Sequence, residues 1–382
     1  MQTDTDAVLD AIDELAERWT AERSERLARR HLERADFDAL IETGYLRLIV
    51  PAEHGGLWTS LAETGPVIVD AVGRLARGDH SVALVASMHP AVMIAWTAAD
   101  EAPDDDADAW AAQRERVFAS ALDGHLWGTI TSEPGSGGDV MRTKAIARPT
   151  DDGGFTLHGA KHFGSGSGMS SFMITTARIE ALDLPLPFFI DLRDNPWDGT
   201  AGVEVTRPWD GMGMKATQSH AAMLDGVGGE VFAWPGALSV AGPTMNALGL
   251  SMFCSVVAAV VDQAMAETDR RLGGRDLRPY EDVTWTQAQV GHWILTQAMK
   301  GLVDELATSP PAQVAVSAVK AKTGMADLAE TVLRDASRAV GGGAFSASSP
   351  YASWFEDVRA LGYLRPPWAL AFDQLSAARQ PD

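Results

Sequence analysis

Hydrophobic and polar positions alternate with a helical period through the first third of this chain. Over residues 5–46 apolar side chains recur every three to four positions, with charged residues on the opposite face. Residues 61–99 predict two more helices that meet at a Gly-Asp pair, and the Ala-, Pro- and Asp-rich stretch 99–109 predicts an exposed connection. We therefore expect an N-terminal helical domain over residues 1–126.

The pattern changes after Leu126. From Trp127 to about Phe232 short runs with β-branched residues are separated by glycine and proline, which is typical of strands and turns. After a Pro-Gly pair the helical period returns and continues to the end of the chain. The long apolar helices predicted there span 248–271, 285–305 and 312–340. The sequence thus predicts a β domain over 127–235 and a helical bundle over 236–382.

Charge and cysteine content narrow the classes of function. The 382 residues include 52 acidic and 31 basic side chains, for a net charge of -21, without a dense basic run. We therefore expect no nucleic acid and no anionic membrane as partner, and any phosphate-bearing ligand must be held by local arginines and backbone dipoles. The single cysteine, Cys254, lies in an apolar run, which indicates a buried, inert thiol.

The N-terminal segment is charged and amphipathic, unlike a secretory signal. No uninterrupted apolar stretch in the sequence reaches the ~18 residues that span a bilayer. We expect a soluble, cytoplasmic protein.

A glycine-rich stretch carries the clearest candidate chemistry. Residues 129–140 read T-I-T-S-E-P-G-S-G-G-D-V, a strand that ends in a turn whose backbone N–H groups could cradle an anion. Residues 157–172 read L-H-G-A-K-H-F-G-S-G-S-G-M-S-S-F, in which hydroxyls and small residues follow an aromatic residue. This combination suits a flat ligand with a polar rim, such as a flavin.

These two stretches resemble the flavin-binding motifs of the acyl-CoA dehydrogenase superfamily. Stretches elsewhere, at 40–57, 209–220, 338–345 and 354–360, resemble further segments of that family in the same order, so the resemblance covers nearly the whole chain. It implies an α+β fold: an N-terminal helical domain, a central β-barrel-like domain and a C-terminal four-helix bundle. It also implies an oxidoreductase that uses FAD, or reduced FAD or FMN supplied by a reductase.

The resemblance assigns cofactor contacts residue by residue. Thr131 and Ser132 stand where the family contacts the pyrimidine edge and N5 of the ring. Phe163 replaces the usual tryptophan beside the ring, and Ser165 replaces the threonine on the N5 side. In the glycine turn, the resemblance places Gly137 and Gly138 near the pyrophosphate, with Gly138 at a position where the family usually has a serine.

The remote half of FAD is implied to lie on a neighbouring subunit. Arg271 matches the family arginine that pairs with the pyrophosphate across the subunit boundary, and Gly341 and Gly342 match the paired glycines of that site. Arg338 stands where a glutamine is common. The resemblance therefore implies a homodimer or homotetramer.

The family's catalytic acid is missing from its usual place. Family dehydrogenases remove the α-proton of an acyl thioester with a glutamate, but residues 364–367 of this chain read Leu-Arg-Pro-Pro, and Met245 and Asn246 occupy the alternative position. An arginine does not act as a base at neutral pH. Glu356 and Asp357 are close in sequence, and the family's matching aspartate is structural.

Three functions stay open from the sequence. The first is oxidation of an acyl thioester or related substrate by hydride transfer to N5, with an unusual base and an electron-transfer partner. The second is a two-component monooxygenase fed reduced flavin by a reductase, which needs a dry pocket and a proton donor in place of a carbon base. The third is a non-catalytic partner subunit of a mixed oligomer.

For the monooxygenase, Ser165 is the candidate near N5. His89 falls in the helix where some related enzymes place an active-site histidine, and a packing role in an apolar helix is the equal alternative. Bulky side chains at Trp209, Trp354 and Trp368 would favour a bulky or aromatic substrate if they border the pocket.

Overall fold

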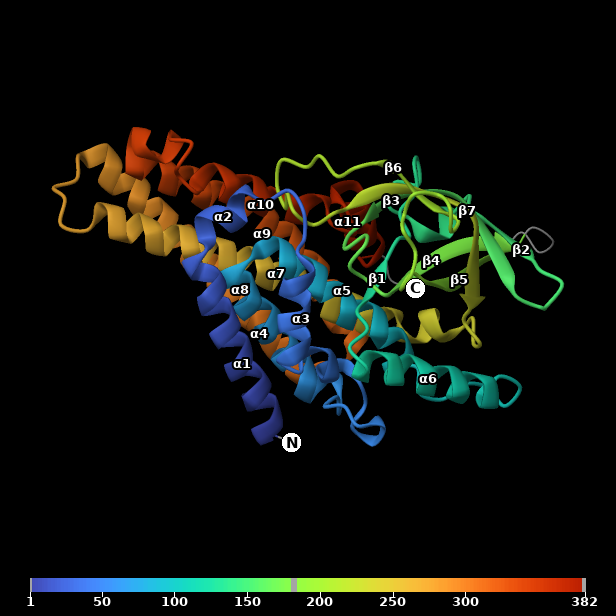
Figure 1. The fold of residues 1–382 in the computed structure, drawn as a ribbon. Helices are drawn as coiled ribbons and strands as arrows, with labels where there is room; N and C mark the ends of the chain where they lie inside the picture. Colours follow the sequence, from blue (N-terminus) through green and yellow to red (C-terminus); the bar gives the residue numbers. More distant parts are fainter. Residues whose placement is uncertain (1, 180–183, 380–382) are drawn as a thin grey trace.

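The structure is a computed structural model that describes residues 2–179 and 184–379. Positions 1 and 380–382, at the ends of the first and last predicted domains, lie outside the described residues. Figure 1 shows long helices packed side by side through most of the molecule and the strands gathered at one end.

The N-terminal third is helical, as predicted. Its helices are α1 (Gln2–Ala21), α2 (Arg23–Ala28), α3 (Arg34–Glu42), α4 (Leu61–Gly78), α5 (His80–Thr97) and α6 (Ala107–Leu122), with short 3-10 turns at Tyr45–Ile49 and Ala52–His54. Asp79 separates α4 from α5, because its side chain accepts a 3.0 Å hydrogen bond from Val82 N and caps α5. A Cβ at Gly78 would lie within 3.0 Å of α1 atoms, so this glycine allows the two helices to approach closely.

The strands form a closed barrel. They are β1 (Trp127–Thr129), β2 (Ile146–Pro149), β3 (Phe155–Gly164), β4 (Phe172–Ile179), β5 (Leu184–Asp191), β6 (Val203–Arg207) and β7 (His220–Val231). The pairings β4-β2-β3-β7-β5 return from β5 to β4, which closes a five-stranded ring with β1 added on β4 and β6 added on β7. Closure leaves no open edge among the five ring strands.

The chain after the barrel forms the second set of helices. They are α7 (Ala237–Leu272), α8 (Pro279–Thr308), α9 (Pro311–Val340), α10 (Tyr351–Tyr363) and α11 (Trp368–Ala377), with the 3-10 turn η4 at Gly341–Phe345. Helix α7 begins well before the predicted position 248, because the helix continues through Pro243. Along the chain the barrel lies between two sets of helices, and the predicted α+β fold class is confirmed.

Helix α7 differs from the expectation that no segment could span a membrane. Its most apolar window has a mean hydropathy of 1.8, so by length and composition the helix could cross a bilayer. However, 83% of that window is buried inside the protein, where α7 lies between α4, α5 and α9. Burial to this extent is typical of a helix in the core of a folded protein.

Two hydrophobic cores hold the described residues together. One fills the barrel, and the other is shared by the helices before and after it. The division into domains at 126 and 235 stays a prediction from the sequence, because the two helical segments pack around a common core. This arrangement places β1 of the barrel against α5, and the glycine turn after β1 against the C-terminal segment at Pro367.

Candidate active site

The two glycine-rich stretches are brought into direct contact at the barrel rim. Ser132 and His162 form an antiparallel bridge in which the His162 backbone N–H donates to Ser132 O at 2.8 Å. Thr131 therefore lies on the same rim as Phe163, one residue away from the bridge on each side. The fold brings together the predicted contacts of the ring.

A buried ion pair fixes this contact. Lys161 Nζ donates to Glu133 Oε1 at 2.6 Å and to Thr176 O at 2.7 Å. Glu133 also accepts from Thr143 and from Lys144 N, so both of its oxygens are bonded. Burial alone would raise the pKa of Glu133, but these hydrogen bonds outweigh it and hold the pKa below its usual value. Glu133 is thus an ionised structural group.

The glycine turn that follows has the backbone geometry that its sequence predicts. Gly135, Gly137 and Gly138 all have positive φ, at 77°, 67° and 89°. A Cβ at Gly138 would lie 3.1 Å from Pro367 of the C-terminal segment. The turn is therefore shaped by glycine at a point where another part of the chain packs closely against it.

Phe163 is held in a strained conformation and is open to solvent. Its φ is 55°, in the left-handed region that a phenylalanine rarely adopts, and its side chain is 58% exposed. The ring lies edge-on to Trp209, with centroids 6.1 Å apart. Strain of this kind at an exposed aromatic residue is typical of a ligand site.

Ser165 begins a chain of hydroxyl groups. Its Oγ lies 2.8 Å from Ser219 Oγ, which in turn lies 2.7 Å from Thr217 Oγ1, and Thr217 donates to Met214 O at 2.9 Å. Each hydroxyl has one proton, so the terminal bond to a carbonyl fixes the direction of the chain: Ser219 donates to Thr217, and Ser165 donates to Ser219. Ser165 Oγ consequently has only lone pairs left to offer a ligand.

Arg365 is the residue that the sequence analysis did not assign to the site. It donates to Thr131 Oγ1 and to Ser132 Oγ, both at 2.8 Å. Burial lowers the pKa of Arg365 to about 10, which still leaves it charged at neutral pH. The sequence signal for Arg365 was its position in a motif where an acid is usual. Its contact with Thr131 joins residues more than 230 positions apart, so only the fold creates it.

The residues predicted to contact the remote half of FAD lie away from the barrel rim. Arg271 donates to Gly343 O at 3.3 Å and to Glu267 at 2.6 Å, and Gly341 and Gly342 lie in the same turn as Gly343. Arg338 is exposed, with its nearest carboxylate 3.9 Å away on Asp335. Helix α7 carries the chain roughly 50 Å from the barrel to Arg271 at 1.5 Å per residue, and Figure 1 shows that end of the bundle opposite the strands.

His89 has the geometry of a packing residue. Its Nδ1 accepts from Trp127 N at 3.2 Å, and its Nε2 lies 3.3 Å from Leu46 O. Burial lowers the pKa of His89 to about 4, so the ring is neutral. Both nitrogens are bonded to backbone, and of the two roles left open by the sequence this geometry favours packing.

The three tryptophans named from the sequence differ in whether they contact the candidate site. Trp209 lies beside Phe163, whereas Trp354 is fully buried against Tyr351 and Trp368 stacks on Phe372. Trp209 is thus the one of the three for which a ring contact ties it to the candidate site.

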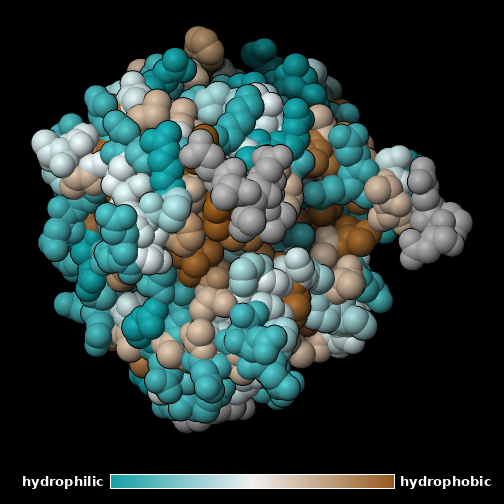
Figure 2. All heavy atoms as spheres, turned by 90° about the vertical axis from the view of Figure 1, so that its right-hand side faces the viewer, coloured by the Kyte–Doolittle hydropathy of each residue, from teal (hydrophilic) through white to brown (hydrophobic). Residues whose placement is uncertain are grey.

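Two hollows lie away from the candidate ring site. One is a groove of about 1110 Å³ between α6 and the barrel, partly lined by Phe155, Phe172 and Phe189. Figure 2 looks toward the barrel end and shows hydrophobic side chains gathered in a depression there. The other is a polar pocket at the start of α5. Neither is lined by Thr131, Ser132, Phe163 or Ser165.

Comparison with known proteins supports the motif resemblance. Residues 128–227 match the family model "Acyl-CoA dehydrogenase, middle domain". The chain is 29% identical over 218 residues to a dibenzothiophene monooxygenase of Rhodococcus qingshengii, a match that covers 54% of this chain and 45% of the relative. The matched segment therefore spans less than half the length of that curated relative.

Solved structures agree in fold over nearly the whole chain. The FMN-bound TdsC of Paenibacillus sp. A11-2 superposes with a TM-score of 0.80 at 20% identity, covering 98% of both chains. Butyryl-CoA dehydrogenase of Megasphaera elsdenii superposes with a TM-score of 0.79 at 18% identity, covering 98% of this chain and 97% of its own. At these identities the likeness establishes the fold.

Proposed function

The chain belongs to the acyl-CoA dehydrogenase superfamily, and from this premise we propose that it is a flavin-dependent oxidoreductase that works as a monooxygenase on flavin reduced elsewhere. The flavin ring would lie on the barrel rim between Phe163, Ser165 and the hydroxyls of Thr131 and Ser132. Reduced flavin supplies the electrons for oxygen activation, and the protein supplies binding, orientation and exclusion of water.

Arg365 is the observation that carries this proposal. A dehydrogenase needs a carboxylate within hydrogen-bond reach of the substrate carbon, and the segment that provides it in the family here provides a guanidinium. Arg365 is fixed by two 2.8 Å hydrogen bonds beside the ring site. A fixed cation there favours an anionic reduced ring and does not accept a proton from carbon.

Carboxylates close to this region have other roles. Glu133 is fully bonded within the rim, and Glu356 pairs with Arg359 at 2.8 Å. Asp357 accepts from Met214 N at 2.6 Å and lies 3.0 Å from His80 Nδ1, which agrees with the structural role expected for it. Asp139, which acts on Arg365 through space, caps the following turn by accepting from Met141 N. None of these is placed as a free base.

The hydroxyl chain supports the same conclusion from the other side of the ring. Because Ser165 donates its proton to Ser219, its oxygen can only accept from a ligand. In the reduced ring N5 carries a hydrogen and donates, whereas in the oxidised ring N5 accepts. Ser165 is therefore matched to reduced flavin.

The remote arginine and glycines bear on oligomeric state. They lie too far from the rim of their own chain to complete one FAD, so a full FAD site would need a second copy, whereas FMN would not. Helix α8 exposes a stripe of large apolar side chains at Val283, Val290, Trp293 and Ile294, and Phe345 beside the glycines is 96% exposed. Exposed apolar stripes of this size are typical of subunit contacts. We include a homodimer or homotetramer and a flavin reductase in the proposal.

Anaerobic mixing tests this function. We expect the purified protein to bind reduced FMN or FAD, to show an absorbance change on meeting oxygen that free reduced flavin lacks, and to stay oxidised with acyl thioesters. Bleaching of bound oxidised flavin by an acyl thioester without oxygen would instead establish the dehydrogenase. Failure to bind flavin in either redox state would leave the non-catalytic partner subunit.

A further inference from the structure

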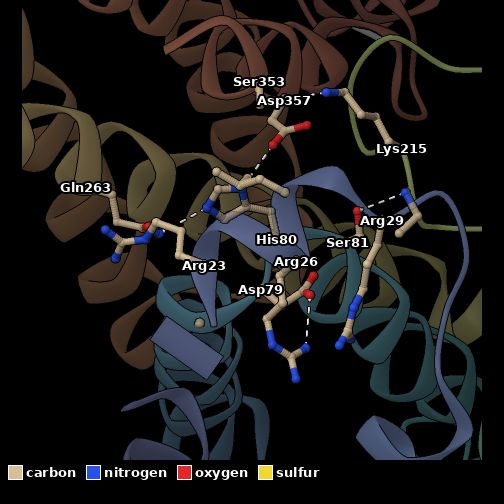
Figure 3. A pocket seen from close by; sticks show the side chains of 13 residues that line it. Arg23, Arg26, Arg29, Asp79, His80, Ser81, Lys215, Gln263, Ser353 and Asp357 are labelled. Carbon is tan, nitrogen blue, oxygen red and sulfur yellow. Dashed lines mark hydrogen bonds and ion pairs between the residues drawn. The ribbon is translucent and has the colours of Figure 1, made fainter. Parts of the chain in front are cut away.

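A second polar pocket lies at the start of α5, separate from the ring site. It is a small hollow of about 20 Å³, partly open to solvent, between α2, the first residues of α5, the segment at Lys215 and Ala216, and α10. Figure 3 shows side chains from these elements pointing into one space. Its lining contrasts with the acidity of the whole chain.

The side chains that line this pocket carry more positive than negative charge. Four cationic side chains line it, Arg23, Arg26, Arg29 and Lys215, against the two carboxylates of Asp79 and Asp357. Arg26 pairs with Asp79 at 3.2 Å and with Asp36 at 2.7 Å, and Arg29 pairs with Asp36 at 3.0 Å. Arg23 and Lys215 remain as the cations without a paired carboxylate in the described lining.

Arg23 has a donor that is buried without a hydrogen-bond partner, its Nε. The guanidinium lies over the Trp354 ring, 5.9 Å from the centroid, and burial lowers the pKa of Arg23 without removing its charge. Glu267 acts on it only through space, because the oxygens of Glu267 are bonded to Arg270 and Arg271. A buried donor left unsatisfied is costly, and a ligand acceptor would relieve that cost.

Lys215 and two serines complete the set of donors. Lys215 Nζ donates to Ser353 Oγ at 3.0 Å, and Ser81 Oγ accepts from Ala216 N at 3.4 Å. Both serines serve as acceptors in these contacts, so their hydroxyl protons are free to be donated. The pocket therefore offers two cations and two hydroxyl donors.

The carboxylates of the pocket cannot compete for those donors. Asp79 is held by Arg26 and by the N–H of Val82. Asp357 is held by His80 and by the N–H of Met214. Gln263 lies 3.0 Å from His80 Nε2, so both nitrogens of the His80 ring have partners.

We propose that this pocket binds a small oxyanion, either free phosphate or sulfate or the same group at the end of a small molecule. Arginine, lysine and hydroxyl donors around a polar hollow are the groups that recognise such anions. The site is independent of the proposed flavin chemistry, because none of its residues lies among those assigned to the ring.

The pocket is nevertheless connected to Ser165. Lys215 and Ala216 line it, and Thr217, the next residue, holds Ser219 and through it Ser165. An anion bound to Lys215 would order the segment on which this hydroxyl chain depends.

Thermal unfolding of the full-length protein with inorganic phosphate, inorganic sulfate and glycerol 3-phosphate, each against chloride at equal ionic strength, tests the proposal. Phosphate or sulfate should raise the midpoint in proportion to the logarithm of its concentration. Tighter binding of glycerol 3-phosphate than of phosphate would identify a group on an organic ligand, and the reverse would identify the free ion.

Two variants locate the site. Arg23→Gln and Lys215→Met should each weaken phosphate binding by about tenfold or more, since each removes a charge-assisted hydrogen bond. Arg18→Gln, which changes an exposed arginine on α1, is the matched control and should bind as the parent does. The proposal is overturned if the oxyanions stabilise the parent no more than chloride does, or if both pocket variants keep the parent's affinity.

Discussion

Lys161 and Glu133 form a buried ion pair at 2.6 Å that joins the two glycine-rich stretches of the barrel rim. Each residue is close in sequence to a candidate ring contact: Glu133 directly follows Ser132, and Lys161 lies two positions before Phe163. The pair thereby sets the distance between the hydroxyl and the aromatic sides of the site.

Replacing Lys161 by Met should lower the free energy of unfolding by about 3–5 kcal/mol, the usual cost of leaving one buried charge unpaired. The double variant Glu133→Gln with Lys161→Met should lose less than the sum of the single variants, because it leaves no buried charge. Urea unfolding measures all three. Additive losses would mean that the two side chains do not depend on each other.

Removing Arg365 should weaken the binding of reduced flavin. Arg365→Ala takes away the cation and both 2.8 Å hydrogen bonds, so we expect a loss of about tenfold or more in affinity. Arg365→Lys keeps the charge but loses the two-pronged guanidinium, so its affinity should lie between those of Arg365→Ala and the parent. Anaerobic fluorescence titration measures the affinity. Arg359→Ala on α10 is the control, and equal affinities for Arg365→Ala and the parent would refute the placement of the ring.

Ser165→Ala should slow turnover at flavin, since it removes the only acceptor that the hydroxyl chain presents to the ring. Ser165→Thr should retain most of the activity because it restores the oxygen. Turnover with reduced flavin and the redox potential of bound flavin are the two measurements, and the potential should shift in Ser165→Ala alone. A variant with unchanged turnover and potential would show that N5 lies elsewhere.

Lys322 gives a prediction about pH. Its Nζ donates to Pro366 O at 2.6 Å, which holds the segment that carries Arg365, and burial lowers the pKa of Lys322 to about 8 from an ordinary value of 10.5. Between these two values the unfolded chain binds more protons than the folded one, so the free energy of unfolding should rise with pH. Below pH 8 both states are protonated, and the cost of the buried charge is present in full.

Chemical unfolding from pH 7 to pH 10.5 checks this. In Lys322→Met the rise of the free energy of unfolding with pH that Lys322 causes should be absent. Lys320 is exposed on the same helix, and Lys320→Met should keep the parent's slope of unfolding free energy against pH. The assignment fails if Lys322→Met rises with pH as steeply as the parent does.

Helix α8 gives a prediction about assembly. Trp293 is 64% exposed in a stripe with Val290 and Ile294, and burying such a stripe against a second copy would stabilise an oligomer. Trp293→Glu should therefore shift the protein to a smaller species in sedimentation velocity, while Lys300→Glu on the same helix should not. A parent that sediments as a monomer would contradict the oligomer and, with it, a shared FAD site.

Local sequence signals determined most of the fold. The change from helical to strand period near residue 126 and back near residue 235 follows from side-chain spacing, which depends only on near neighbours along the chain. The glycine turn was predictable for the same reason, because Gly135, Gly137 and Gly138 occupy positive-φ positions that other residues avoid. Helix α7 was misjudged at its start, since a proline near the first turns of a long helix reads as a boundary.

Only the tertiary structure decided what the candidate site contains. The sequence showed that an arginine replaces the usual acid, but not that Arg365 reaches Thr131 and Ser132, because that contact depends on the path of a distant segment across the rim. His89 could not be assigned from its helix alone, since its partners Leu46 and Trp127 come from other elements. Hydrogen bonds between distant parts of the chain have no periodic signature, so the chemistry of the site became visible only once the barrel and the helices had been placed together.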